Sequence, residues 1–306
     1  MGNERVTDSI YQIDACTFKL LNFTSAYLIV GKELALIESG PAKSAPFVIE
    51  GIKEFGFDPC DITYIIITHI HLDHGGGAGT LLKDMPQAKV VAHEKGVKHL
   101  IDPTKLVNSS KRVFGDLINE WYGEVLPVEQ NRVMPVKDGD VIDLGKGQRL
   151  RMIDSPGHAN HHICIYSEAS KGLFTGDTAG VYFKDFNTVI PTTPPPEFDP
   201  DINIKTMNDL MKLDLNLLLF SHFGSTSNVD ETLNKSIGLL KKWKDSIFEI
   251  KKEDVTMDRV IEKFREYTNE LLDSTNKEDD LYKWIISHHI PMCAAGYLHY
   301  FNKKST

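Results

Sequence analysis

The 306-residue sequence is poor in cysteine and lacks long apolar runs. Its four cysteines stand far apart and form no Cys-x-x-Cys pair, so we expect neither a disulfide framework nor a cysteine-rich zinc module. No apolar stretch is long enough to span a bilayer, and residues 1–8 lack the apolar core of a secretory signal. These absences predict a cytoplasmic protein with free buried thiols and no membrane partner.

The sequence also lacks an excess of basic residues. Lys and Arg number 34 against 43 Asp and Glu, which gives a formal net charge of −9. An acidic protein gains no general attraction to a phosphate backbone, so nucleic acid is an unlikely partner and a small-molecule substrate is favoured. With 41% hydrophobic residues, the chain can bury a large core.

Short apolar runs separated by turns predict strands in two groups. The first group is 10–18, 26–30, 34–37, 64–67 and 89–92, and the second is 141–144, 149–154, 162–166, 172–175 and 217–220. Helical spacing lies between and around these runs, which predicts an α+β fold with two sheets packed face to face and helices outside. From residue 230 to residue 304 the chain is charged and helix-like. We therefore expect a catalytic domain at 1–228 and a helical region at 229–306.

Two further segments are interpreted by their composition. Residues 94–126 are expected to be mainly helical, and the spacing of Trp121 and Tyr122 favours core packing over ligand contact. The proline-rich segment 190–200 cannot be a helix or a central strand. We interpret it as a wall of an active-site pocket, with a polyproline ligand for a partner domain as the alternative.

The densest chemical signal is the loop Thr68–Gly77. Three histidines and one aspartate fall within six positions, directly after the apolar run 64–67: His69, His71, Asp73 and His74. Imidazole and carboxylate ligands together suit Zn, Fe, Mn or Co better than Ca or Mg. Surface histidines are the alternative, but four such residues at a strand end favour a metal site.

Three later residues repeat this pattern of an apolar run, a potential ligand and then a small or turn residue. They are His158, Asp177 and His222. Singly, each is more often structural, and an Asp in Gly-Asp-Thr is frequently a turn residue. As a set with the loop, they bring the number of candidate ligands to seven, which suits a two-metal site.

The seven ligands divide into two groups with a shared carboxylate. One ion can take His69, His71 and His158. The other can take Asp73, His74 and His222. Asp177 can bridge them, which leaves each metal an open position of the kind that catalytic sites keep. Metal binding lowers the pKa of water from ~15.7 to about 7 and so supplies a nucleophile.

With these residues, the sequence resembles the metallo-β-lactamase-fold hydrolase superfamily over about residues 10–225. The family pattern is His-x-His-x-Asp-His followed by a His, a bridging Asp and a last His, in the order found here. The resemblance implies a four-layer αββα sandwich with the metals at one edge of the two sheets. It also implies a C-terminal helical extension of the kind seen in several subfamilies.

Within that superfamily the segment 155–164 is similar to hydroxyacylglutathione hydrolase-like (glyoxalase II-like) enzymes. The resemblance implies that His162 supports the ligands without binding metal, whereas His161 stands where the family usually has glycine. Glu38 stands where relatives usually carry Asp, and we expect it to orient a ligand loop. His93 lies near the expected site, and a structural role is favoured for it.

The favoured function is hydrolysis of a small ester, thioester or lactone by metal-bound hydroxide, with Asp73 handling the proton. Two divalent ions are expected, zinc first and iron or manganese as alternatives. A phosphodiesterase or tRNA-processing nuclease of the same fold is one alternative function, and a mononuclear iron enzyme similar to persulfide dioxygenase is another. The apolar segment 291–301 is expected to dock over the sandwich or to form a homodimer contact.

Overall fold

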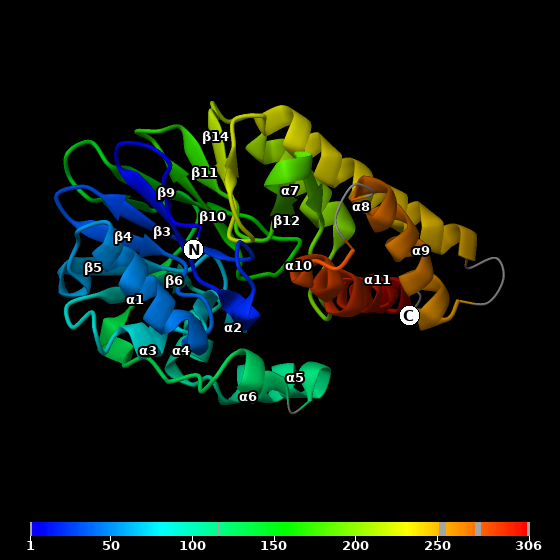
Figure 1. Cartoon of the computed structure of the whole chain (residues 1–306), viewed down its shortest axis with the longest axis horizontal. Coiled ribbons are helices and arrows are strands. Elements are labelled where there is room, and N and C mark those ends of the chain that lie inside the picture. The colour runs from blue at the N-terminus through cyan, green and yellow to red at the C-terminus, as the bar shows by residue number, and fades with distance from the viewer. Residues whose placement is uncertain (1, 116, 251–254, 273–276, 305–306) are drawn as a thin grey trace.

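The computed structural model describes residues 2–115, 117–250, 255–272 and 277–304. It is built from two large β-sheets that pack face to face (Figure 1). The first sheet has seven strands in chain order: β1 (Glu4–Arg5), β2 (Ile10–Asp14), β3 (Ser25–Val30), β4 (Leu34–Ile37), β5 (Ile62–Ile66), β6 (Lys89–His93) and β7 (Val133–Val136). The strands from β1 to β4 pair antiparallel, and those from β4 to β7 pair parallel.

The second sheet has six strands in the order β15-β14-β11-β10-β9-β8. They are β8 (Val141–Asp143), β9 (Arg149–Asp154), β10 (Ile163–Ser167), β11 (Gly172–Phe174), β14 (Leu217–Leu219) and β15 (Ser225–Thr226). A separate hairpin pairs β12 (Val181–Phe183) with β13 (Thr188–Ile190). This hairpin was not predicted from the sequence. Asn187 adopts a left-handed conformation in the turn between its two strands.

Helices cover the outer faces of both sheets, and several others lie beside one edge of the sandwich (Figure 1). They are α1 (Ala45–Glu54), α2 (Leu72–Gly75), α3 (Ala78–Leu81), α4 (Val97–Ile101), α5 (Thr104–Phe114), α6 (Leu117–Trp121), α7 (Pro200–Leu210), α8 (Val229–Ile250), α9 (Met257–Leu271), α10 (Asp280–Trp284) and α11 (Ile290–Lys304). A π-helical turn, Ile285–His289, joins α10 to α11, and short 3-10 turns lie at Thr17–Lys19, Ala42–Ser44, Pro59–Asp61, Gln130–Arg132 and Lys184–Phe186. No described helix is long and apolar enough to cross a bilayer.

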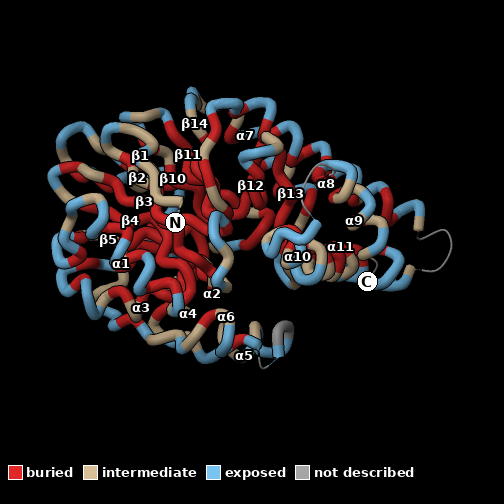
Figure 2. The backbone as a smooth tube through the Cα atoms, in the orientation of Figure 1, coloured by how far each residue is buried: buried red, intermediate tan, exposed pale blue. Residues whose placement is uncertain are grey.

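Alternation along the strands explains why both faces of the first sheet are covered. Ile29 and Ile37 pack between the two sheets, whereas Leu28 and Leu36 point to the other face and pack with Val48 and Ile52 of α1. Successive strand residues point to opposite faces, so a strand buried on both sides must be apolar throughout. Figure 2 shows this burial running through both sheets. The predicted αββα sandwich is confirmed.

One predicted strand is shorter than expected. The run 10–18 was expected to be a single strand, but β2 ends at Asp14, and a 3-10 turn at Thr17–Lys19 follows. Cys16, Phe18 and Lys19 have φ between 47° and 63°, which no strand can accommodate. The apolar residues there line a turn and not a sheet.

The C-terminal helices dock on the second sheet and form one continuous apolar core with it. Trp243 of α8 stacks on Phe264 of α9 with ring centroids 4.2 Å apart, and Tyr297 of α11 donates a hydrogen bond to the Leu240 carbonyl. The predicted helical region is confirmed for the described residues; residues 251–254 and 273–276 lie outside them. Helix α8 begins at the predicted boundary, and separate domains at 1–228 and 229–306 stay a prediction.

Candidate metal centre

The His-rich loop lies at the carboxyl end of β5, in the first sheet. The strand ends at Ile66, and the short helix α2 begins at Leu72, so His69 and His71 occupy the connection and Asp73 and His74 the helix. The later candidates are also at strand ends. His158 follows β9, Asp177 follows β11 and His222 follows β14. Both sheets therefore present ligands at one edge.

The first ligand group brings three imidazoles together. His71 Nδ1 lies 2.9 Å from His69 Nε2 and 3.0 Å from His158 Nε2. His158 donates from Nδ1 to the Thr192 carbonyl at 2.9 Å, which turns its Nε2 toward the other two rings. Backbone anchoring of the second ring nitrogen is how proteins fix a metal-binding histidine.

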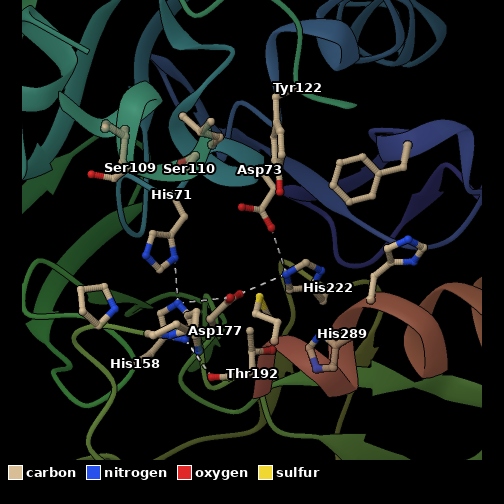
Figure 3. Close-up of a pocket in the computed structure, with 18 of the residues that line it drawn as sticks. His71, Asp73, Ser109, Ser110, Tyr122, His158, Asp177, Thr192, His222 and His289 are labelled. Carbon is tan, nitrogen blue, oxygen red and sulfur yellow. Dashed lines mark hydrogen bonds and ion pairs between the residues drawn. The ribbon is translucent and has the colours of Figure 1, made fainter. Parts of the chain in front are cut away.

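The second group consists of Asp73, His74 and His222. Asp73 Oδ2 lies 3.5 Å from His74 Nε2 and 3.6 Å from His222 Nε2. Asp177 stands between the groups. Its Oδ1 lies 3.2 Å from His74 Nε2 and 3.4 Å from His222 Nε2, and its Oδ2 lies 3.4 Å from His158 Nε2 and 4.0 Å from His69 Nε2. One oxygen thus faces each group, as Figure 3 shows.

Two buried atoms at the centre support a cation between these groups. His74 Nε2 and Asp177 Oδ1 lie 3.2 Å apart, yet neither makes a hydrogen bond of acceptable geometry with a described residue. Leaving a buried polar atom unsatisfied costs about 1–3 kcal/mol, so such atoms in a folded protein call for an explanation. Metal coordination would satisfy both atoms. Within the described part of the chain, the three His/Asp groups that could hold an ion all lie here.

The pKa shifts of the histidines at the site also support a bound cation. Burial, and then the neighbouring His158, lowers the pKa of His71 to about 3, and burial likewise holds the pKa of His69 well below its usual value. Both rings are therefore neutral at pH 7, the form that binds metal. Burial opposes the charge on His74, yet Asp177, Asp73 and Glu38 together raise its pKa well above the usual range. The carboxylates favour a positive charge where a metal would sit.

Glu38 connects the ligand loops. Its Oε1 accepts hydrogen bonds from His74 Nδ1 at 2.9 Å, from Thr68 Oγ1 at 2.6 Å and from Ser221 Oγ at 2.6 Å. Thr68 in turn lies 3.0 Å from His69 Nδ1. Glu38 is buried and has φ of 68°, an uncommon conformation for a residue with a side chain. The predicted orienting contact is present.

His162 supports the bridging aspartate from behind. Its Nε2 accepts a hydrogen bond from the Asp177 backbone N–H at 3.1 Å. Gly176 permits this approach, because a Cβ at this position would lie 2.3 Å from the His162 ring. Gly176 also has a φ of +50°, which favours glycine. His93 lies 3.1 Å from Asp154 outside the ligand groups, and His161 lies 3.7 Å from Glu197. The structure therefore gives His162 the supporting contact expected for it.

A cavity of about 190 Å³ opens over the ligands. Figure 3 shows His71, Asp73, His158, Asp177 and His222 at its floor. Its walls come from segments distant in sequence: Phe18, α5 with Tyr122, the prolines 194–196, and the C-terminal helices with Trp284, His288, His289 and Met292. The proline-rich segment thus lies at the cavity, as expected.

Outside the proline-rich segment, the individual residues of the cavity wall were not predicted from the sequence. Tyr122 was interpreted as a core residue, but it lines the cavity and points from the end of α6 toward Asp73 (Figure 3). Phe18 was assigned to a strand and Trp284 only to the C-terminal helical region, because nothing local marks either as a pocket residue. Their position depends on how the turn after β2 and the C-terminal helices meet.

The fold and the clustered histidines and aspartates define a metal-binding αββα protein of the metallo-hydrolase class. The model of the metallo-beta-lactamase superfamily matches residues 21–222. The chain belongs to the metallo-β-lactamase superfamily.

The chain is similar to proteins of more than one kind. The metallo-beta-lactamase fold-containing protein ST1585 of Sulfurisphaera tokodaii is 33% identical over 223 residues, which cover 71% of this chain and 79% of that protein. Its crystal structure superposes with a TM-score of 0.70 and 25% identity, covering 95% of this chain and 99% of that one.

Two further relatives are named for different chemistry. The probable metallo-hydrolase MJ0888 of Methanocaldococcus jannaschii is 31% identical over 159 residues, covering 52% of this chain and 68% of that protein. The flavo-diiron protein FprA2 of Clostridium acetobutylicum is 29% identical over 215 residues, covering 65% of this chain and 48% of that protein. The chain thus spans about half the length of the flavo-diiron relative.

Proposed function

We propose that the protein is a metal-dependent hydrolase of a small ester, thioester or lactone, with two divalent ions in its site. The observation that carries the proposal is the position of Asp177, whose two oxygens face two separate groups of ligands. A single carboxylate between two such groups supports a dinuclear site. The cavity above it gives a small molecule access.

The ligands have distinct roles in this proposal. His69, His71 and His158 would hold one ion, Asp73, His74 and His222 would hold the other, and Asp177 stands between the two groups. Ions in such a site supply activated water at neutral pH and polarise a carbonyl oxygen. Asp73 has the most exposed carboxylate of the set, with 21% of its side chain accessible, and it lines the cavity. It is placed to carry a proton toward the departing group.

The donor set favours particular metals. Its five imidazoles and two carboxylates include no thiolate, a combination that suits zinc and is compatible with iron or manganese. We propose zinc as the first candidate. The resemblance to the glyoxalase II-like branch adds thioesters, including glutathione thioesters, to the substrates to be tested.

Iron redox chemistry is the second candidate function, because relatives include a flavo-diiron protein and several diflavin flavoproteins. The similarity to the diflavin flavoproteins covers about a quarter of their length. In this case the same residues would hold iron, and oxygen consumption would replace hydrolysis.

Metal removal and restoration tests the hydrolase proposal. Purified protein is assayed on neutral and anionic esters, a γ-lactone, S-lactoylglutathione and a phosphodiester, before and after chelation, and then with zinc, iron or manganese restored. We expect carboxylic ester, lactone or thioester hydrolysis that chelation abolishes and one metal restores. Oxygen uptake by the iron form without hydrolysis of any substrate would overturn the proposal.

A further inference from the structure

The walls of the cavity differ from its floor in charge. Among the described residues that line it, none is Lys or Arg, and the two carboxylates, Asp73 and Asp177, both face the ligand groups. Burial lowers the pKa of His289 to about 4, so this wall histidine is neutral at pH 7. Its Nε2 donates to the Pro191 carbonyl at 2.9 Å. The described walls therefore hold two histidines, His288 and His289, but no Lys or Arg to pair with an anionic substituent.

The walls are instead largely apolar, although Ser109, Ser110 and Thr192 also line the cavity. The aromatic rings of the walls are in contact with one another. Phe18 stacks on Trp284 with ring centroids 5.3 Å apart, and it contacts Trp121 at 5.2 Å and Tyr122 edge-on at 5.3 Å. Trp121 in turn meets His288 edge-on at 5.0 Å. These rings come from the turn after β2, from α6 and from the C-terminal helices. Their contacts join the three segments into one apolar band above the metal ligands.

The size of the cavity limits what the band can hold. An apolar protein cavity of about 150 Å³ accommodates a benzene molecule. The present cavity of about 190 Å³ is slightly larger, so it suits a group of one aromatic ring or a medium-length acyl chain. A carboxylate among these walls would lose hydration and gain no Lys or Arg partner, only hydroxyl and imidazole groups, which is unfavourable.

We propose that the substrate is uncharged beyond its reacting carbonyl and carries an apolar aromatic or acyl group that packs against Phe18, Trp284 and Met292. This inference rests on the proposed hydrolase function and narrows it. It favours neutral esters and lactones over glutathione thioesters, whose peptide part carries carboxylates.

A matched pair of esters tests the charge preference. The 4-nitrophenyl ester of hexanoic acid and the 4-nitrophenyl monoester of adipic acid share six acyl carbons and the leaving group, and they differ in a terminal carboxylate. We expect kcat/KM to be at least about tenfold higher for the neutral ester, a typical discrimination for an apolar pocket. Equal rates, or faster hydrolysis of the adipate or of S-lactoylglutathione, would overturn the inference while leaving the hydrolase proposal intact.

A charged wall residue should reverse this preference. Met292 of α11 is partly buried and lines the cavity, so Met292→Lys places an ammonium group in the apolar band. We expect the hexanoate-to-adipate ratio of kcat/KM to fall at least about tenfold. Met257→Lys is the matched control, because Met257 is 41% exposed on α9 and does not line the cavity. An unchanged ratio in Met292→Lys with normal folding would count against the proposed wall.

Binding gives a readout that does not depend on turnover. Of the three tryptophans, Trp284 lines the cavity, Trp121 contacts Phe18 without lining the cavity, and Trp243 is fully buried elsewhere. Hexanamide should change the tryptophan fluorescence of the metal-loaded protein. The monoamide of adipic acid should bind at least about tenfold more weakly. The Trp284→Phe variant should lose most of the fluorescence change caused by hexanamide. Selective hexanamide binding without any ester hydrolysis would refute the hydrolase proposal but uphold the apolar pocket. Equal binding of both amides would refute the pocket itself.

Discussion

The floor and the walls of the cavity are built in opposite ways. The floor consists of buried polar side chains at strand ends of the two sheets, each held by a specific hydrogen bond or ion pair. The walls are aromatic and apolar side chains on helices and turns, held by packing between segments that are distant in sequence. The floor sets which chemistry is possible, and the walls determine which molecule reaches it.

This difference predicts that the two regions respond separately to substitution. Changes in the floor should remove metal and activity together for every substrate. Changes in the wall should alter substrate affinity and selectivity with metal content unchanged. Each of the following substitutions is expected to confirm or break this separation.

The largest effect is expected for Asp177→Ala in the floor. Removing the carboxylate that faces both groups should cost most of the bound metal and lower kcat more than a hundredfold, because even residues that only support metal ligands typically contribute 10–100-fold. Elemental analysis and steady-state kinetics measure the two effects. The exposed Asp209→Ala is a matched control. Hydrolysis that survives the loss of most metal would contradict the proposed mechanism.

A smaller effect is expected for Glu38→Gln, which keeps the shape of the side chain but removes its charge. Glu38 accepts hydrogen bonds through both oxygens, from His74, Thr68 and Ser221 at Oε1 and from the Thr68 backbone N–H at Oε2, and an amide nitrogen cannot accept at either position. Metal affinity should fall about 10–100-fold. Competition with a chelator measures that affinity, and restoring a carboxylate in Glu38→Asp should recover part of it. The exposed Glu50→Gln should leave the affinity unchanged; a fall of equal size in both variants would argue against a specific role for Glu38.

Gly296→Ala tests the wall. A Cβ at this buried position in α11 would lie 1.8 Å from the Thr193 carbonyl oxygen, so the helix and the proline-rich segment must separate. We expect a loss of about 1–3 kcal/mol in the free energy of unfolding and a higher KM, with two metals retained. Gly238→Ala in α8 meets no atom within 4 Å and should be neutral or stabilise by up to about 1 kcal/mol. Metal loss in Gly296→Ala would show that floor and wall are not separable.

The smallest effect is expected at Asp201, which ties α7 to the C-terminal helices. Burial raises the pKa of Asp201, but hydrogen bonds from Lys244, Tyr300 and Lys304 outweigh it and hold the pKa well below its usual value. A depressed pKa means that the ionised form stabilises the fold above a pH of about 3.9 and that this contribution is lost as pH falls through the lower folded value. The side chain is 46% exposed, so Asp201→Asn should cost only about 0.2–1 kcal/mol at pH 7. Urea midpoints at pH 7 and near pH 2 measure this difference, because only the lower pH lies well inside the window in which the contribution is lost; an equal effect at both values would contradict the electrostatic explanation.

The floor could be predicted from the sequence because its signals are local. Each ligand follows an apolar run and precedes a turn, and strand ends that meet at one sheet edge bring such residues together. The position of Glu38 at the end of β4 was also readable from its motif. The packing of the two sheets followed from the same alternation of apolar runs.

The walls could not be predicted because their positions depend on long-range packing. Phe18 was assigned to a strand, but its left-handed backbone places it in a turn beside Trp284, and the two residues are separated by most of the chain. Tyr122 has the helical spacing of a core residue, and only the docking of α6 near Asp73 brings it to the cavity. Apolar spacing alone does not distinguish a residue that fills a core from one that lines a cavity.

The metal content of the purified protein tests the central claim most directly. Elemental analysis, made alongside the hydrolysis assay on the same preparation, should find two divalent ions per chain, with activity proportional to their occupancy. A single iron per chain, with oxygen uptake and no hydrolysis, would contradict the dinuclear hydrolytic site.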